Sequence, residues 1–139
     1  MTVISKSIRI NSNGNCDMID ITAQIAREIS NSEIDSGTAT IFICGSTAGI
    51  STIEYEGGLV NDFKDMWNRN VPQNIPYQHD RRWGDGNGHS HVRASLLGPS
   101  LVIPFINKKL ALGTWQQVTV VDFDNRPRSR EIIIQLIGE

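Results

Sequence analysis

The stretch HSHVRASLLGPSLVIPFINKKLALGTWQQVTVVDFDNRPRSREIIIQLI, residues 89–137, decides the fold class. Its runs of Val, Ile and Leu are separated by Gly, Pro and Asn, a pattern typical of consecutive β-strands. No helical spacing of comparable length interrupts it, so we expect the second half of the chain to be a sheet. The expected strands are 89–97, 100–106, 110–124 and 129–137.

The first half of the chain adds two amphipathic helices to these strands. After an expected strand at 2–10, apolar residues recur at helical spacing and predict a helix over about 17–31. A buried strand at 40–44 and a second helix over about 59–70 follow. Helices first and strands afterwards predict one α+β domain spanning residues 1–139. The apolar stripe of the first helix comprises Met18, Ile21, Ile25 and Ile29.

Composition and charge exclude several classes of function. The 139 residues are 39% hydrophobic and 20% charged, as in ordinary globular proteins. Thirteen Lys and Arg against fifteen Asp and Glu give a net charge of -2, so no general field attracts nucleic acid or anionic membranes. The first ten residues alternate polar and apolar, unlike a signal peptide, and no apolar run has the length of a membrane span. Two isolated cysteines, Cys16 and Cys44, are typical of reduced thiols. We therefore expect a soluble, cytoplasmic protein.

All three histidines fall within thirteen residues, His79, His89 and His91, beside the long irregular segment 71–88. Irregular segments of this length in compact domains are often functional. On the strand expected at 89–97, His89, His91 and Arg93 would share one face. With His79 as a third ligand, they would suit a divalent cation, Zn²⁺ or similar, with Mg²⁺ also possible. The alternative is an exposed strand edge beside an unrelated loop histidine.

Arg126, Arg128 and Arg130 alternate with other residues, so an extended chain would point all three the same way. Such a row of guanidinium groups favours a phosphate or diphosphate ligand. The alternative is a strand face paired with acidic residues such as Asp122 and Asp124.

Three further residues are candidates near turns. Ser46 and Thr47 belong to GSTAG at 45–49, a turn after a buried strand whose hydroxyl and amide groups suit an oxyanion. Glu54, a few residues on, is a candidate base or ligand, or else an exposed strand carboxylate. Gln116 follows Trp115 within a β run, where packing in the core is the usual interpretation.

The segments from GNGHSHVRASLLGPSLVIPF to LGTWQQVTVVDFD and RPRSR closely resemble the YjbQ-like family, to which a secondary thiamine-phosphate synthase activity is ascribed. The resemblance covers nearly the whole chain. It implies a curved, mostly antiparallel sheet or barrel with two main helices, assembled as a homotrimer. The family's N-x-x-x-H corresponds to Asn87 and His91, and its glutamate to Glu54. The family's H-T-T-A histidine is replaced by Gly45, and His89 is an extra histidine.

The resemblance implies a transferase that joins a hydroxymethylpyrimidine diphosphate to a thiazole phosphate. Such a reaction requires cations around the leaving diphosphate and accurate positioning of the substrates. We therefore expect Glu54, His91 and Arg128 to be catalytic. A metal-dependent phosphoester hydrolase, or a non-enzymatic trimer that binds a metal or a small molecule, would use the same parts. The expected anion-binding residues are Ser46, Thr47, Asn87, Arg93, Gln116, Arg126, Arg128 and Arg130, and the expected metal ligands are His79, His89 and His91.

Overall fold

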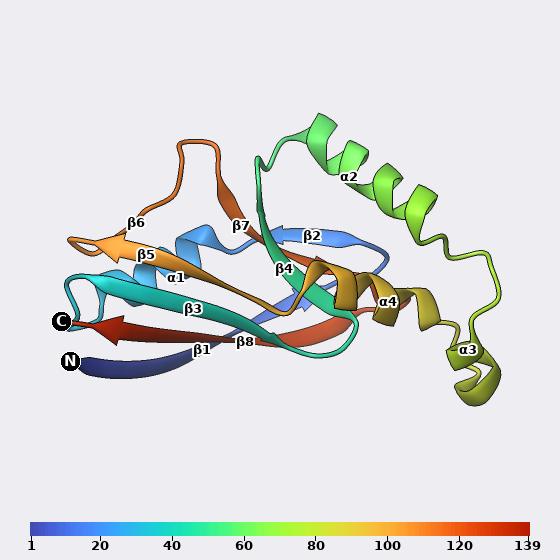
Figure 1. Ribbon diagram of the computed structural model, residues 1–139, viewed down its shortest axis with the longest axis horizontal. Coiled ribbons are helices and arrows are strands. Elements are labelled where there is room, and N and C mark those ends of the chain that lie inside the picture. The colour runs from blue at the N-terminus through green and yellow to red at the C-terminus, as the bar shows by residue number, and fades with distance from the viewer.

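The computed structural model describes all residues, 1–139. The chain forms eight strands and four helices, with three helices in succession before the last four strands (Figure 1). Their bounds are β1 (Thr2–Ser12), β2 (Asp17–Asp20), α1 (Thr22–Ser30), β3 (Gly37–Cys44), β4 (Ala48–Ile53), α2 (Gly57–Asn70), α3 (Gln78–Trp83), α4 (Gly88–Leu97), β5 (Ser100–Ile106), β6 (Lys109–Leu110), β7 (Gln117–Asp122) and β8 (Arg128–Gly138).

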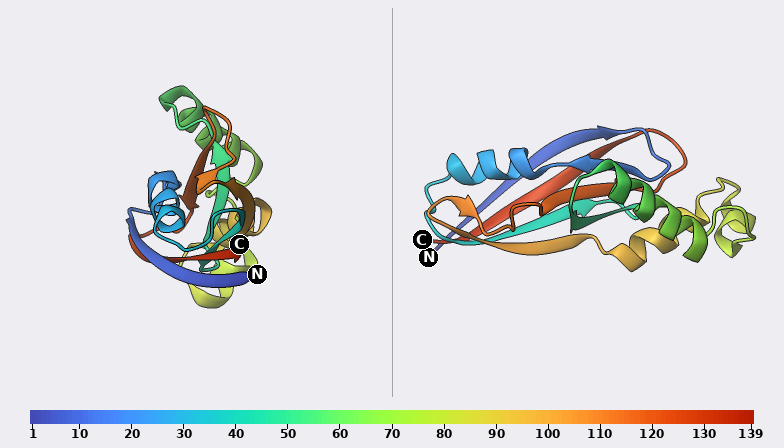
Figure 2. Two further views of the ribbon diagram at one scale, coloured as in Figure 1. Left: turned by 90° about the vertical axis from the view of Figure 1, so that its left-hand side faces the viewer. Right: turned by 90° about the horizontal axis from the view of Figure 1, so that it is seen from above.

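The strands form two sheets, a larger one in the order β1-β8-β3-β5-β6 and a smaller one in the order β2-β7-β4. Every pair of neighbouring strands is antiparallel. Seen end-on, the larger sheet curls, and α1 lies on its concave side (Figure 2). The expected α+β class with a curved antiparallel sheet is therefore confirmed at this level.

The main core fills the space between the curled sheet and α1. Successive residues of a strand point to opposite faces, so Ile132, Ile134 and Leu136 of β8 all point inward and are fully buried. They join Ile25 and Ile29 of α1 in one hydrophobic cluster. The expected apolar stripe of the first helix is thus core.

A second, smaller core lies between α2 and the other face of β7. Trp67 of α2 packs edge-on against Phe123, with ring centroids 4.9 Å apart. Because Val120 faces the main core and Val121 the second one, β7 is buried on both faces. Its end carries the buried Asp122 toward the segment where β8 begins.

Three of the elements expected from the sequence are present with different bounds. The helix expected over 59–70 is confirmed as α2, whose first amides donate to the Glu56 side chain. The helix expected from residue 17 begins at Thr22, because 17–20 pair with β7 as β2. The stretch expected as one strand at 110–124 is divided into the end of β6, an irregular turn and β7.

The prediction of a strand at 89–97 is wrong, because this segment is helix α4. Its buried residues are Gly88, His89, Ser90, Arg93 and Ala94, a pattern that includes helical spacings of three and four and does not alternate. The helix ends at Gly98, with a φ of 97°, directly before Pro99. Glycine followed by proline is a common helix stop. The expected irregular segment 71–88 likewise contains a short helix, α3.

The two ends of the chain lie together, far from α3 (Figure 1). The Met1 amine is 3.5 Å from the Glu139 side-chain carboxylate. None of the four helices combines the length and the apolar character that a membrane crossing requires.

Candidate active site

A pocket of about 460 Å³ lies where the β3–β4 turn, α3, the α3–α4 connection, α4 and the start of β8 meet. Pockets of this size suit small-molecule ligands. Trp83 is its one hydrophobic lining residue. The lining residues are Gly45, Ser46, Thr47, His79, Trp83, Asp85, Asn87, His91, Arg128 and Arg130.

One wall is a network of two arginines and two buried carboxylates. Arg130 donates from Nε and one terminal nitrogen to both oxygens of Asp122, at 2.7 and 2.9 Å. Arg128 donates from Nε to Asp124 at 2.7 Å. Both carboxylates are fully buried, so the guanidinium groups provide the charge partners that burial requires. The alternative interpretation, in which the arginines pair with Asp122 and Asp124, therefore holds for Arg128 and Arg130. The carboxylates of this network are buried rather than solvated.

The network also fixes Thr47 and the charge of Asp124. The Thr47 hydroxyl donates to Asp124 at 3.0 Å and accepts from Arg130 at 2.6 Å. Burial by itself would raise the pKa of Asp124, but hydrogen bonds from Arg128, the Asn125 amide and two side chains lower it below its ordinary value. Asp124 therefore stays ionised and holds the arginines in place.

The opposite wall carries a pair of histidines. The rings of His79 on α3 and His91 on α4 have centroids 4.4 Å apart. Burial, followed by the neighbouring His79, lowers the pKa of His91. At neutral pH the His91 imidazole is therefore uncharged and able to accept a proton.

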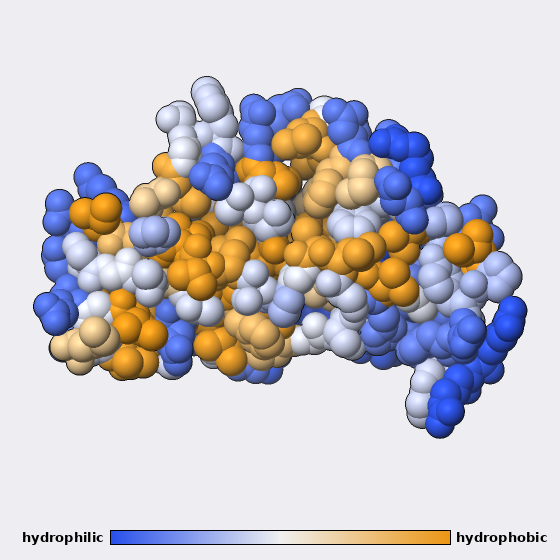
Figure 3. All heavy atoms as spheres, in the orientation of Figure 1, coloured by the Kyte–Doolittle hydropathy of each residue, from blue (hydrophilic) through white to orange (hydrophobic).

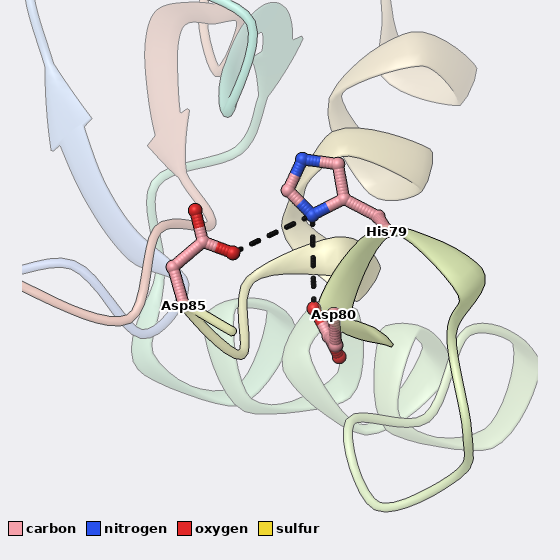
Figure 4. A group of neighbouring side chains, drawn as sticks. All are labelled: His79, Asp80 and Asp85. Carbon is pink, nitrogen blue, oxygen red and sulfur yellow. Dashed lines mark ion pairs between the residues drawn. The ribbon is translucent and has the colours of Figure 1, made fainter. Parts of the chain in front are cut away.

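His79 also faces two carboxylates, as Figure 4 shows. Its Nδ1 atom is 3.7 Å from Asp80 and 3.6 Å from Asp85. Both distances are longer than a hydrogen bond, and this buried nitrogen has no hydrogen-bond partner. Asp80, Asp85 and Trp83 are site residues that the sequence interpretation missed, although they lie in the unusual segment 71–88.

The structure brings together seven of the residues singled out in the sequence. They come from four separate parts of the chain, and alternation along β8 explains why two arginines reach the same wall. The seven are Ser46, Thr47, His79, Asn87, His91, Arg128 and Arg130.

His89 and Arg93 lie away from this pocket, contrary to the expectation that they share a face with His91. On a helix, residues two apart point to nearly opposite sides. His89 is buried with its ring 6.3 Å from that of Tyr77. Arg93 donates to the Val71 carbonyl at 2.9 Å and to the Asn68 side chain, at the C-terminal end of α2.

Three other candidates lie outside the pocket as well. Arg126 is exposed in the turn before β8, because Pro127 separates it from the strand. Glu54 is exposed just after β4. Gln116 is also exposed, rather than packed in the core, and donates to Thr52 at 3.0 Å beside a separate, mainly apolar cavity.

Acid should weaken the fold partly through His89. Burial, with Arg93 as the second cause, lowers the pKa of His89 from its ordinary value of 6.5. The unfolded chain then binds this proton at higher pH than the folded chain does, so stability falls as the pH drops below about 6.5. We expect His89→Gln to reduce the loss of unfolding free energy between about pH 7.5 and pH 5, measured with urea. An equal loss in both proteins would contradict this account.

The fold and the polar pocket define a class of small α+β proteins with a curled antiparallel sheet. A YbjQ-like protein of unknown function from Sulfolobus solfataricus has the same fold, with a TM-score of 0.89, 29% identity and coverage of 99% of this chain and 100% of that one. A structure of the YjbQ/UPF0047 family from Clostridium acetobutylicum has a TM-score of 0.86 and 30% identity, and the match covers 95% of this chain and 99% of that one.

The chain belongs to the YjbQ/UPF0047 family. The family model "UPF0047 protein YjbQ-like" matches residues 6–139. A UPF0047 protein of Archaeoglobus fulgidus is 36% identical over 121 residues, covering 87% of this chain and 91% of that protein. Another, from Methanothermobacter thermautotrophicus, is 33% identical over 139 residues, covering 100% and 95%. These names carry no activity, so they support the family and not the synthase activity that the resemblance implied.

Proposed function

We propose that this chain is an enzyme that binds a phosphate or diphosphate group of a small molecule in the pocket between β8 and α4. The observation that carries the proposal is the pair of guanidinium groups on the β8 wall. Each is anchored through Nε to a buried carboxylate, and both residues line the pocket. Arginines held in this way present donors for oxyanions without a cost of reorganisation.

The donors available to a ligand follow from the hydrogen bonds. Arg128 uses only Nε within the protein, which leaves both its terminal nitrogens free. Arg130 uses Nε and one terminal nitrogen, and its other terminal nitrogen faces Gly45. A Cβ at residue 45 would lie 2.6 Å from that nitrogen. Any other residue at this position would therefore crowd that nitrogen, and glycine keeps the space beside it open.

The leading reaction is of the thiamine-phosphate synthase type. A ring nitrogen of a thiazole phosphate attacks the methylene carbon of a hydroxymethylpyrimidine diphosphate, so that a C–N bond forms and a C–O bond breaks. The diphosphate leaves with the bonding electrons. Arg128 and Arg130 would stabilise the charge that accumulates on it, and the turn at Ser46 and Thr47 would position it.

Hydrolysis of a phosphate ester is a second candidate, favoured by the neutral His91. A water molecule would lose a proton to the imidazole as its oxygen attacks phosphorus. The P–O bond to the alcohol would break with its electrons on the alcohol oxygen, which would take up the proton from the imidazolium. The carboxylates beside His79 offer ligands for a divalent cation that could assist this step.

The purified chain, incubated with the two thiamine precursors or with p-nitrophenyl phosphate, separates these candidates. Each reaction is run with added Mg²⁺ or Zn²⁺ and with EDTA. Thiamine phosphate formed in step with diphosphate supports the synthase, and nitrophenol release supports the hydrolase. Turnover of neither substrate, with saturable diphosphate binding, would overturn the enzymatic proposal in favour of a binding protein. Absence of binding would overturn the anion pocket itself.

We also propose that the chain assembles as a homotrimer. Large apolar side chains are exposed along the larger sheet, including Phe42 of β3 and Val102 and Ile106 of β5. Figure 3 shows hydrophobic surface over β5 on the face toward the viewer. Exposed apolar surface of this kind is typical of association sites. Light scattering should give three times the chain mass of 15.4 kDa, and the mass of a monomer would contradict the proposal.

A further inference from the structure

We propose that His79, Asp80 and Asp85 bind a divalent metal cation at the edge of the pocket. The role of this cation in binding or reaction rests on the proposed function. The site itself is defined by the side chains alone and is tested without any substrate. It replaces the ligand set expected from the sequence, because His89 lies elsewhere.

The distances within the cluster fit a shared ion. One ligand atom from each of the three residues lies within 4.8 Å of the others. Two ligands bound at about 2.0–2.2 Å to one tetrahedral ion are about 3.3–3.6 Å apart. The separations from His79 Nδ1 are 3.6 Å to Asp85, at the upper end of that range, and 3.7 Å to Asp80, just above it, and both are beyond hydrogen-bond length. A cation between these atoms would also provide the partner that the buried Nδ1 lacks.

The backbone holds the three ligands in position. His79 and Asp80 are neighbours in the first turn of α3. Gly84 and Gly86 adopt φ values of 70° and 68°, which other residues rarely adopt, and they return the chain so that Asp85 faces His79.

Neighbouring groups also hold the Asp80 carboxylate and the backbone of Asp85. The Gly88 amide donates to Asp80 Oδ1 at 2.8 Å, and Asn125 donates to the Asp85 carbonyl at 2.7 Å. Outer hydrogen bonds of this kind orient metal ligands and raise affinity.

The ligand chemistry and the charge of the pocket favour a divalent cation of the first transition row, Zn²⁺ included. One imidazole and two carboxylates form a mixed nitrogen and oxygen set, which suits Zn²⁺, Mn²⁺ or Co²⁺ better than Mg²⁺. In the pocket, Arg128 and Arg130 are balanced by Asp122 and Asp124, so they add little net positive charge. A divalent cation near Asp85 would offset the charge of the Asp80 and Asp85 carboxylates. It would face a bound phosphate or diphosphate from the wall opposite the arginines.

A protonated His79 paired with both carboxylates is the rival explanation, and Co²⁺ titration distinguishes the two. We expect one Co²⁺ per chain, with the visible absorption of a nitrogen-and-oxygen ligand set, and displacement by Zn²⁺. Loss of a group that merely orients a ligand costs about 10- to 100-fold in affinity, so Asp85→Asn, which removes a ligand, should cost at least as much. Asp85 is half-exposed, and this substitution keeps its size, so we expect the fold to persist.

Two control variants make the test specific. Asp62→Asn, on the exposed side of α2, should leave Co²⁺ affinity unchanged, as should His89→Gln. Sub-stoichiometric Co²⁺, or equal affinity in Asp85→Asn and the parent chain, would overturn the site. Loss of binding in His89→Gln with an intact fold would overturn this ligand set. Because diphosphate binding is measured separately in EDTA, failure of the metal site and failure of the anion pocket are distinguishable.

Discussion

Replacing Arg130 with Met should lower the free energy of unfolding by about 3–5 kcal/mol, the range for breaking a buried ion pair by removing one partner. Arg130 holds Asp122 through two hydrogen bonds, and the Asp122 carboxylate is fully buried. Met fills much of the same volume but leaves that carboxylate without its cation. Ser12 and one backbone amide remain as its hydrogen-bond donors.

Urea denaturation of the variant and two controls measures this effect. Arg126→Met removes an arginine of the same row that is exposed and unpaired, so it should change stability by no more than about 0.5 kcal/mol. Adding Asp122→Asn to Arg130→Met removes the uncompensated charge and should recover part of the loss. A loss below about 1 kcal/mol for Arg130→Met would show that the network contributes little to the fold.

Replacing Arg128 with Gln should reduce kcat/KM for the phosphorylated substrate about 10- to 100-fold. Hydrogen bonds to charged groups contribute about 1.5–3 kcal/mol, and each 1.4 kcal/mol corresponds to a factor of ten. Arg128 offers two terminal nitrogens to the pocket, and Gln reaches less far and carries no charge. The same variant should weaken diphosphate binding by a similar factor.

Arg126→Gln is again the matched control and should keep kcat/KM within about twofold of the parent. The urea midpoint of each variant shows whether the fold is retained, since Arg128 also pairs with Asp124. Equal activity of the parent and a folded Arg128→Gln would remove Arg128 from the anion site. The contrast between two arginines two positions apart isolates the pocket from general charge effects.

Patterns with a clear period predicted most of the fold. Alternation gave β1 and β8, and spacing of three and four gave α2. The segment 89–97 failed because its apolar residues are few and its buried face includes Ser90 and Arg93, which periodicity of hydrophobic residues does not detect. The stop signal at Gly98 and Pro99 was the better indicator of a helix.

The helical spacing that begins at Met18 was also misleading in part. Met18 is buried, but as part of β2 against β7, and only Ile25 and Ile29 belong to α1. A long-range strand pairing overrode the local pattern, and no single-sequence periodicity contains that information.

The candidate site could be predicted where local geometry suffices and not where tertiary contacts decide. Alternation placed Arg128 and Arg130 on one wall of the pocket, and two of the three clustered histidines, His79 and His91, line the same pocket. The partners of His79 could not be inferred, because Asp85 returns to it only through the two glycine turns of the α3–α4 connection.

The adjacency of Met1 and Glu139, at the end opposite α3, has a practical consequence. A purification tag or a fused protein at either end would leave the pocket unobstructed. Because the ends nearly touch, a short Gly- and Ser-rich linker could join them, and circular permutants opened at an exposed loop tip should then fold. Immobilising the chain through these ends would present the histidine and arginine walls toward solution.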